Sequence, residues 1–147
     1  MLKQTNQDSV NRIIDANINR AKEGLRVCEE IVRFILENRQ LSARFKKIRH
    51  KITFLAESLG SQDDLLKGRA SLKDVGRAIL AGELRRAGLR DIFSANMQRV
   101  KESVRVLEEF SKLKNTKTAL GFKAIRYKIY EIEKNVLTCL PVGRRET

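Results

Sequence analysis

The sequence is poor in residues that interrupt helices. Its 147 residues include one proline, eight glycines and no tryptophan. This composition favours long helices and argues against a β-sandwich or a glycine-rich nucleotide loop. Neither a Walker A sequence nor a GxGxxG pattern occurs, so the two common phosphate-binding loops are absent.

Long apolar runs and clustered cysteines are also missing. No stretch approaches the roughly 20 apolar residues that span a bilayer, and the start MLKQTNQDSV is too polar for a signal peptide. The chain has two cysteines, no CxxC pair and one histidine, which excludes a metal cluster of histidine and cysteine. We therefore expect a cytoplasmic protein without membrane association, with Cys28 a buried small hydrophobe and His50 on a helix surface or in the core.

What the chain has in excess is positive charge. Its formal net charge is +13, with 41% hydrophobic and 33% charged residues, which is a globular composition. Such a charge attracts nucleic acid, an acidic membrane surface or small phosphorylated substrates, and does not choose among them.

Apolar periodicity predicts an all-α chain with no strands. The predicted long helices are Ser9–Asn38, with Asp8 or Ser9 as its cap, Leu41–Leu59, Leu89–Lys114 and Thr118–Leu137. A loop with at most a turn of helix follows at 61–77, and a short helix is predicted at Ala78–Ala87. We expect one domain, 1–140, ending in a flexible tail, 141–147.

The chain repeats itself. Residues 16–31, ANINRAKEGLRVCEEI, match residues 95–110, ANMQRVKESVRVLEEF, at nine of sixteen positions, with an offset of 79. Residues 45–52, FKKIRHKI, match residues 122–129, FKAIRYKI, at six of eight positions, with an offset of 77. We therefore predict a helical bundle of two repeated long hairpins, about 9–59 and about 89–137, joined by a connector, 60–87.

The repeated residues include polar ones on a largely apolar face. On a helical wheel Asn17 lies near the middle of an apolar arc of roughly 200°, Arg20 lies inside it, and Glu23 and Glu30 lie at its edge. The second copy places Asn96, Arg99, Glu102 and Glu109 at the same angles, and Arg49 and Arg126 occupy matching places in the partner helices.

Two interpretations of these polar residues are open. Either they form a structural ion-pair network, or the face lines a pocket for a polar ligand, which their duplication favours. Arginine suits phosphate, and glutamate and asparagine oxygens suit Mg2+. Several arginines and carboxylates without a nucleophile–base pair fit phosphoryl transfer. In the loop RASLKDVGR, Asp74 before Gly76 is either turn chemistry or part of a lid that carries Arg69 over a nucleotide.

The paired AN-x-x-R-x-x-E-x-x-R-V-x-E-E signature, with IRHKI, IRYKI and RASLKDVG, resembles a bacterial family over residues 10–135. That family is the hydroxymethylpyrimidine-phosphate kinase domain often fused to thiamine-phosphate synthase. The resemblance implies ATP- and Mg2+-dependent phosphorylation of 4-amino-2-methyl-5-hydroxymethylpyrimidine phosphate to its diphosphate, with thiamine-phosphate synthase as a candidate partner. Ala70 and Lys73 depart from the loop pattern of the family, and Gly24 and Ser103 differ within the repeat. The sequence has no synthase domain, so we expect a stand-alone or excised version.

The site residues carried over by the resemblance fall into three groups. The catalytic candidates are Arg20, Glu23, Arg99 and Glu102. The candidates for binding substrate or nucleotide are Asn17, Arg49, Arg69, Asn96 and Arg126. The metal-binding candidates are Glu30, Asp74 and Glu109.

Two other functions compete with the kinase. The first is nucleic-acid binding, which the charge favours, although only eight aromatic residues are available for base stacking and many basic residues alternate with glutamate. The second is an ATP-dependent transferase like the cobalamin adenosyltransferase bundle, an analogy of fold alone. The wide apolar arc also leaves room for a homo-oligomer.

Overall fold

The computed structural model describes residues 4–79 and 81–142, and within them it contains helices and no strands. The first hairpin consists of α1 (Gln4–Glu30), continued by a π-helical segment, η1 (Ile31–Ile35), and of α2 (Arg39–Glu57). The second consists of α4 (Leu89–Ser111) and α5 (Thr116–Cys139). The connector between them holds a short helix, α3 (Gln62–Gly68), and two 3-10 turns, η2 (Ser71–Lys73) and η3 (Ala81–Leu84). The predicted all-α bundle of two hairpins is confirmed.

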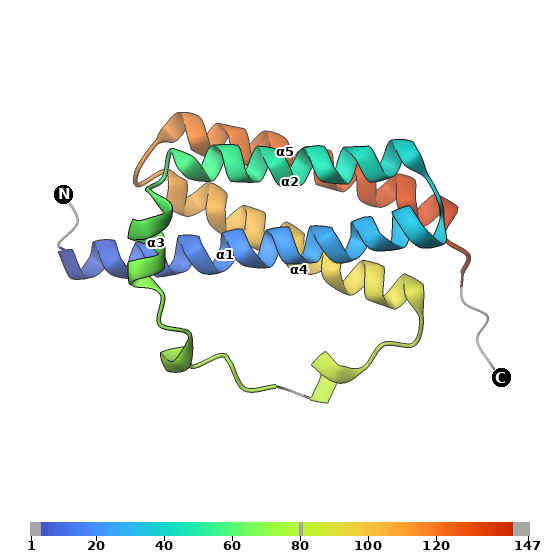
Figure 1. Ribbon diagram of the computed structural model, residues 1–147, viewed down its shortest axis with the longest axis horizontal. Coiled ribbons are helices and arrows are strands. Elements are labelled where there is room, and N and C mark those ends of the chain that lie inside the picture. Colours follow the sequence, from blue (N-terminus) through green and yellow to red (C-terminus); the bar gives the residue numbers. More distant parts are fainter. Residues whose placement is uncertain (1–3, 80, 143–147) are drawn as a thin grey trace.

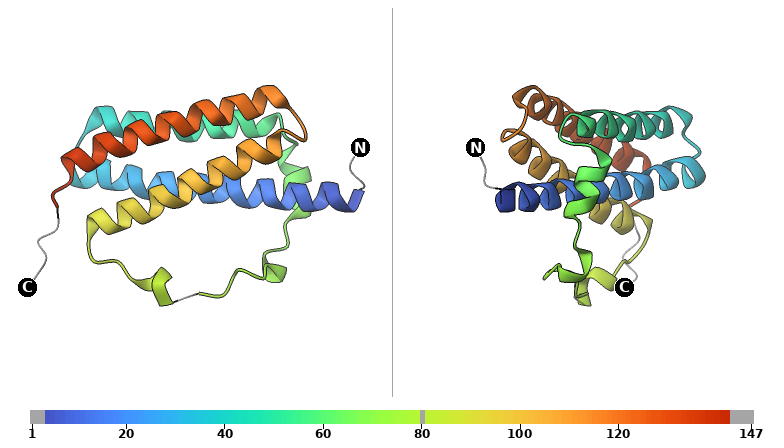
Figure 2. Two further views of the ribbon diagram at one scale, coloured as in Figure 1. Left: turned by 180° about the vertical axis from the view of Figure 1, so that it is seen from behind. Right: turned by 60° about the vertical axis from the view of Figure 1, so that its left-hand side comes forward.

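The four long helices form two layers. Figure 1 and both views of Figure 2 show α1 and α4 crossing in one layer and α2 and α5 in the other, while the connector runs along the open side of α1 and α4. The most extensive helix pairing is between α1 and α4, so the two repeats pack mainly through their first helices. Gly24 lies at this crossing, where a Cβ atom would be 2.6 Å from Val100 Cγ2 and 3.1 Å from the Asn96 carbonyl oxygen.

One hydrophobic core is shared by both repeats. Three phenylalanines that are fully buried lie in it, Phe45, Phe93 and Phe122, and the first two meet edge to face with ring centroids 6.4 Å apart. Phe45 and Phe122 are repeat counterparts, so each hairpin contributes the same large side chain to the common interior. Neither hairpin can bury its apolar face without the other.

In each hairpin, an asparagine caps the N-terminus of the second helix. The side chains of Asn38 and Asn115 accept hydrogen bonds from the backbone N–H groups of Leu41 and Thr118, at 3.0 and 3.2 Å. These two caps are again 77 residues apart, so the repeat extends to the way that α2 and α5 begin.

Several predicted boundaries need correction. α1 begins at Gln4, so Asp8 and Ser9 lie inside the helix and the predicted cap is wrong. The short helix predicted at Ala78–Ala87 is only the 3-10 turn η3, whereas the loop predicted to hold at most a turn of helix contains α3, capped by the Ser61 hydroxyl. The predicted flexible tail lies outside the described residues from position 143 onward. No helix in the described part of the chain is long and apolar enough to cross a bilayer.

Candidate functional site

The two repeated asparagines turn back onto their own helices. Asn17 is buried and its amide donates a 2.8 Å hydrogen bond to the Ile13 carbonyl, while the half-buried Asn96 makes the same bond to Ile92. The predicted place of Asn17 inside the apolar face is therefore confirmed. These bonds use part of each amide and leave its oxygen available to a ligand.

The four predicted catalytic residues lie at the surface. Arg20, Glu23, Arg99 and Glu102 are all exposed, so the prediction that Arg20 lies inside the apolar arc is wrong. The arc was too wide because it counted apolar residues that the chain itself does not bury. Two of them, Val27 and Phe34, are 36% and 61% exposed.

A buried ion-pair network does exist, but on other carboxylates. Glu29 is 4% exposed and accepts hydrogen bonds from Arg49 at 2.9 and 3.2 Å and from Arg26 at 3.2 Å. This network ties α1 to α2. Sequence reasoning missed Glu29, although a glutamate and an arginine repeated together in both copies was the available signal.

The second repeat contains the counterpart network. Glu108, 2% exposed, accepts hydrogen bonds from Arg105 and, at 3.4 and 3.5 Å, from Arg126. It ties α4 to α5 as the first network ties α1 to α2. Arg49 and Arg126, predicted to bind substrate or nucleotide, thus have structural partners, and their role as ligand-binding residues stays a prediction.

The three predicted metal-binding residues lie in different places. Glu30 pairs with Arg26 at 3.1 Å, and Glu109 pairs with Arg105 at 3.3 Å and with Lys112 at 2.8 Å. The hydrogen bond from Lys112 lowers the pKa of Glu109. Asp74 accepts a 2.8 Å hydrogen bond from the backbone N–H of Gly76, which is the turn chemistry considered for this loop. Among the described residues, no three acidic, histidine or cysteine side chains form a group that could hold a metal ion.

One predicted site residue of the connector, Arg69, contacts α1. Arg69 donates two hydrogen bonds of 2.8 Å, from Nε and Nη2, to the carboxylate of Asp15, which is 9% exposed. This bond pair raises the pKa of Arg69. A planar guanidinium bound by two parallel hydrogen bonds fixes the start of the loop against α1. Asp15 was not predicted, because its repeat counterpart is Ser94 and no internal match marks it.

A pocket of about 450 Å3 opens between α1 and this loop. Four residues of the predicted site line it: Asn17 and Arg20 from α1, and Arg69 and Asp74 from the connector. The two pairs are far apart in the chain and come together because Asp15 holds Arg69. We call this hollow the loop pocket.

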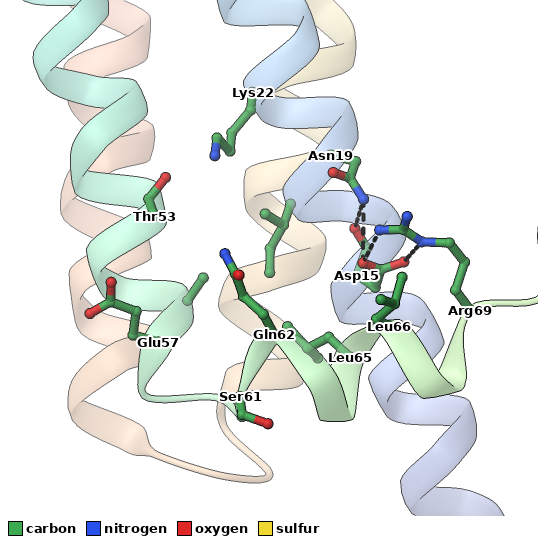
Figure 3. Close-up of a pocket in the computed structure, with 13 residues that line it drawn as sticks. Asp15, Asn19, Lys22, Thr53, Glu57, Ser61, Gln62, Leu65, Leu66 and Arg69 are labelled. Carbon is green, nitrogen blue, oxygen red and sulfur yellow. Dashed lines mark hydrogen bonds and ion pairs between the residues drawn. The ribbon is translucent and has the colours of Figure 1, made fainter.

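A second pocket of about 330 Å3 lies on the other side of the Asp15–Arg69 pair, between α1, α2 and α3 (Figure 3). We call it the hairpin pocket. It shares three residues with the loop pocket: Asp15, Asn19 and Arg69. Its other walls are formed by the following residues: Ile18, Lys22, Thr53, Ala56, Glu57, Gly60, Ser61, Gln62, Leu65 and Leu66.

No cysteine or histidine lines either of these pockets. Cys28 is fully buried, as predicted. Burial raises the pKa of Cys28 to about 12, and its Sγ lies 3.7 Å from the Phe93 carbonyl oxygen, so the thiol stays protonated. His50 is exposed on α2, which is the first of its two predicted positions, a helix surface or the core. Neither residue lines the loop pocket or the hairpin pocket.

Comparison with known proteins places the chain in a family. Residues 12–135 match the ThiD2 family. Proteins named thiamine-phosphate synthase are similar: that of Synechocystis sp. is 39% identical over 92% of this chain and 38% of its own length. The protein of Nostoc punctiforme is 38% identical over 92% and 37%, and that of Rhodopirellula baltica 39% identical over 86% and 34%. The chain thus spans little more than a third of these relatives, and no solved structure matches it significantly. With most of its length matched, from within α1 into α5, this chain belongs to the ThiD2 family.

Proposed function

We propose that this chain is a kinase that transfers the γ-phosphoryl group of Mg-ATP to 4-amino-2-methyl-5-hydroxymethylpyrimidine phosphate, giving the diphosphate for thiamine biosynthesis. Membership of the ThiD2 family and similarity to proteins named thiamine-phosphate synthase support a place in that pathway. A thiamine-phosphate synthase is the partner that would use the product.

The observation that carries the proposal is the difference among the repeated arginines. Arg26, Arg49, Arg105 and Arg126 all pair with carboxylates. Arg20 and Arg99, in contrast, have no hydrogen bond or ion pair within the described residues, although both copies of the repeat contain this arginine. A repeated guanidinium without a protein partner is suited to bind the oxygens of a phosphate.

Both free arginines lie close to the crossing of α1 and α4. Gly24, where a Cβ atom would meet the Asn96 carbonyl and Val100, is one helical turn after Arg20, and Arg99 adjoins Val100 in the sequence. Arg20 also lines the loop pocket with Asn17, Arg69 and Asp74. Both repeats therefore contribute a cation near this crossing, and in this proposal the two arginines neutralise a polyphosphate there.

The reaction asks little covalent chemistry of the protein. An oxygen of the acceptor phosphate forms a bond to the γ-phosphorus of ATP while the bond to the β–γ bridging oxygen breaks, and ADP leaves with that electron pair. A phosphomonoester loses its second proton at a pKa of about 6, so the attacking oxygen is anionic at neutral pH and needs no general base. In this proposal Arg20 and Arg99, which no described carboxylate neutralises, supply positioning and charge neutralisation, while Arg69 is held beside Arg20 in the loop pocket by Asp15.

The described residues suit a magnesium ion that arrives with ATP better than one held by the protein alone. They contain no group of three ligands for a resident ion. Mg2+ in phosphoryl-transfer sites often uses one or two carboxylates and the substrate phosphates. Asp74 in the loop pocket and the exposed Glu23 and Glu102 are the carboxylates that would serve.

The proposal is tested by an assay that couples ADP release to an optical signal, with pyrimidine phosphate and Mg-ATP as substrates. We expect turnover that depends on all three components and a product with the phosphorus spectrum of a diphosphate. Release of inorganic triphosphate instead of ADP would point to a nucleoside transferase. Folded protein without turnover above background would remove the kinase proposal.

A further inference from the structure

The hairpin pocket has a counterpart in the second repeat, where an ion pair occupies the equivalent place. Lys101 on α4 pairs with Glu133 on α5 at 3.0 Å. The repeat offsets of 79 and 77 place Lys22 at the position of Lys101 and Ala56 at the position of Glu133. The first repeat thus keeps the lysine and lacks the carboxylate that neutralises it.

The consequence is a lysine without a protein partner on the pocket wall. Lys22 is partly buried and makes no hydrogen bond or ion pair within residues 4–79 and 81–142. Figure 3 shows its ammonium group pointing from α1 across the pocket toward Thr53 on α2. Of the two carboxylates that line the pocket, Asp15 is neutralised by Arg69, and Glu57 makes no ion pair with Lys22. A partly desolvated ammonium that no ion pair neutralises favours an anion from solution.

The remaining walls suit a small ring with polar edges. Ile18, Leu65 and Leu66 provide apolar surface, and Asn19 and Gln62 provide amides that both donate and accept hydrogen bonds. Gln62 extends from α3 into the space between α1 and α2 (Figure 3). A volume of about 330 Å3 is near the lower end for ligand pockets and suits a compact ligand better than a nucleoside triphosphate.

We infer that the hairpin pocket is the acceptor subsite, which binds a small phosphorylated aminopyrimidine with Lys22 as the cation for its phosphate. The inference rests on the proposed kinase function and adds the place of the acceptor. The loop pocket is then the place of the donor polyphosphate. Arg69, which lines both pockets, lies at the boundary where the two phosphates meet.

Two substitutions test the subsite. Lys22→Gln removes the charge, and Ala56→Glu recreates the carboxylate that the second repeat has opposite its lysine. Lys101→Gln is the matched control, because it changes the counterpart lysine outside both pockets. Calorimetric titration with the pyrimidine phosphate, without ATP, measures acceptor binding separately from turnover, and circular dichroism melting verifies that each variant folds.

We expect Lys22→Gln and Ala56→Glu to weaken acceptor binding and raise the KM for pyrimidine phosphate at least tenfold, with the KM for ATP within twofold of wild type. Lys101→Gln should leave both KM values unchanged. A Lys22→Gln protein that binds the acceptor like wild type, or loses affinity for ATP instead, would overturn the subsite, as would a wild-type protein that does not bind the acceptor. Acceptor binding that depends on Lys22 without any turnover would retain the subsite and remove the kinase function.

Discussion

The two repeats share their framework and differ in what surrounds it. Both have an asparagine-capped hairpin turn and a buried glutamate that binds an arginine of the partner helix. Within the described residues, the first repeat is followed by α3 and the connector, and there the position equivalent to the Lys101–Glu133 pair opens into the hairpin pocket. Identity between the copies therefore covers the packing residues together with Arg20 and Arg99, whereas divergence accounts for the hairpin pocket of the first repeat.

The outer faces of the second helices diverge in another way. α5 exposes Leu120, Tyr127 and Tyr130 at the positions where α2 has the counterparts Ala43, His50 and Thr53. Arg126 lies 5.4 and 5.9 Å from the centroids of the two tyrosine rings and donates a hydrogen bond to the Tyr130 hydroxyl at 3.2 Å. At these positions the larger exposed side chains thus belong to the second repeat. Whether the chain forms the predicted homo-oligomer can be tested by measuring its mass in solution.

The largest effect should come from breaking the shared framework. Glu29→Ala and Glu108→Ala each leave a poorly exposed arginine without its carboxylate, and we expect each to lower the free energy of unfolding by about 3 kcal/mol. Urea denaturation followed by circular dichroism measures both. Similar losses in the two variants would establish that the networks are equivalent, whereas a near-neutral change in either would show that its arginine reaches water.

The free arginines should behave in the opposite way. Arg20→Ala and Arg99→Ala are each expected to lower kcat/KM by about 100-fold or more, because each removes a cation from the developing charge. Since both side chains are exposed, stability should change by less than about 0.5 kcal/mol. Steady-state kinetics and thermal melting together decide the matter. Wild-type turnover in one variant would assign the chemistry to the other repeat alone.

The crossing of α1 and α4 offers a smaller contrast. A methyl group at Gly24 would meet Val100 and the Asn96 carbonyl, so Gly24→Ala should destabilise the fold by about 1–3 kcal/mol. Its counterpart Ser103 already has a Cβ and donates a hydrogen bond to the Arg99 carbonyl, so Ser103→Ala should cost about 1 kcal/mol or less. Equal effects in chemical denaturation would mean that the helices separate enough to accommodate the methyl group.

The smallest effect concerns thiol reactivity. Cys28 stands where the second repeat has Leu107, and both side chains are fully buried. A thiol reagent should therefore label the exposed Cys139 quickly in the native protein and Cys28 only after unfolding. Counting reacted thiols before and after adding denaturant tests this, and two fast thiols would indicate that α1 and α4 open readily.

Much of the fold could be predicted because apolar spacing reports which face of a helix is buried. The long helices Leu41–Leu59 and Thr118–Leu137 came within two residues of their observed ends. The wheel failed for Arg20 because it treated every apolar residue as interior, whereas Val27 and Phe34 remain exposed. The apolar spacing along a helix does not reveal how much of its apolar face the rest of the same chain buries.

The candidate site was predictable only where the repeat or the family resemblance marked it. The repeat marked Asn17 and Arg20, and the resemblance marked Arg69; all three line the loop pocket, but their roles remain predictions. Asp15 and Lys22 were missed because their importance depends on where α3 and the connector return to α1. That return follows a turn at Gly60, whose φ of 154° favours glycine, and no periodic pattern encodes it.

The common interior has a consequence for how the two halves can change. Each hairpin completes the hydrophobic core of the other. A substitution in the core of one hairpin therefore affects the packing of both, and neither core can change independently. The outer surfaces of the two hairpins are not constrained in this way. Two identical chains would have to change both surfaces together, but the two halves of one polypeptide can keep an ion pair on one surface and have a pocket at the equivalent place on the other.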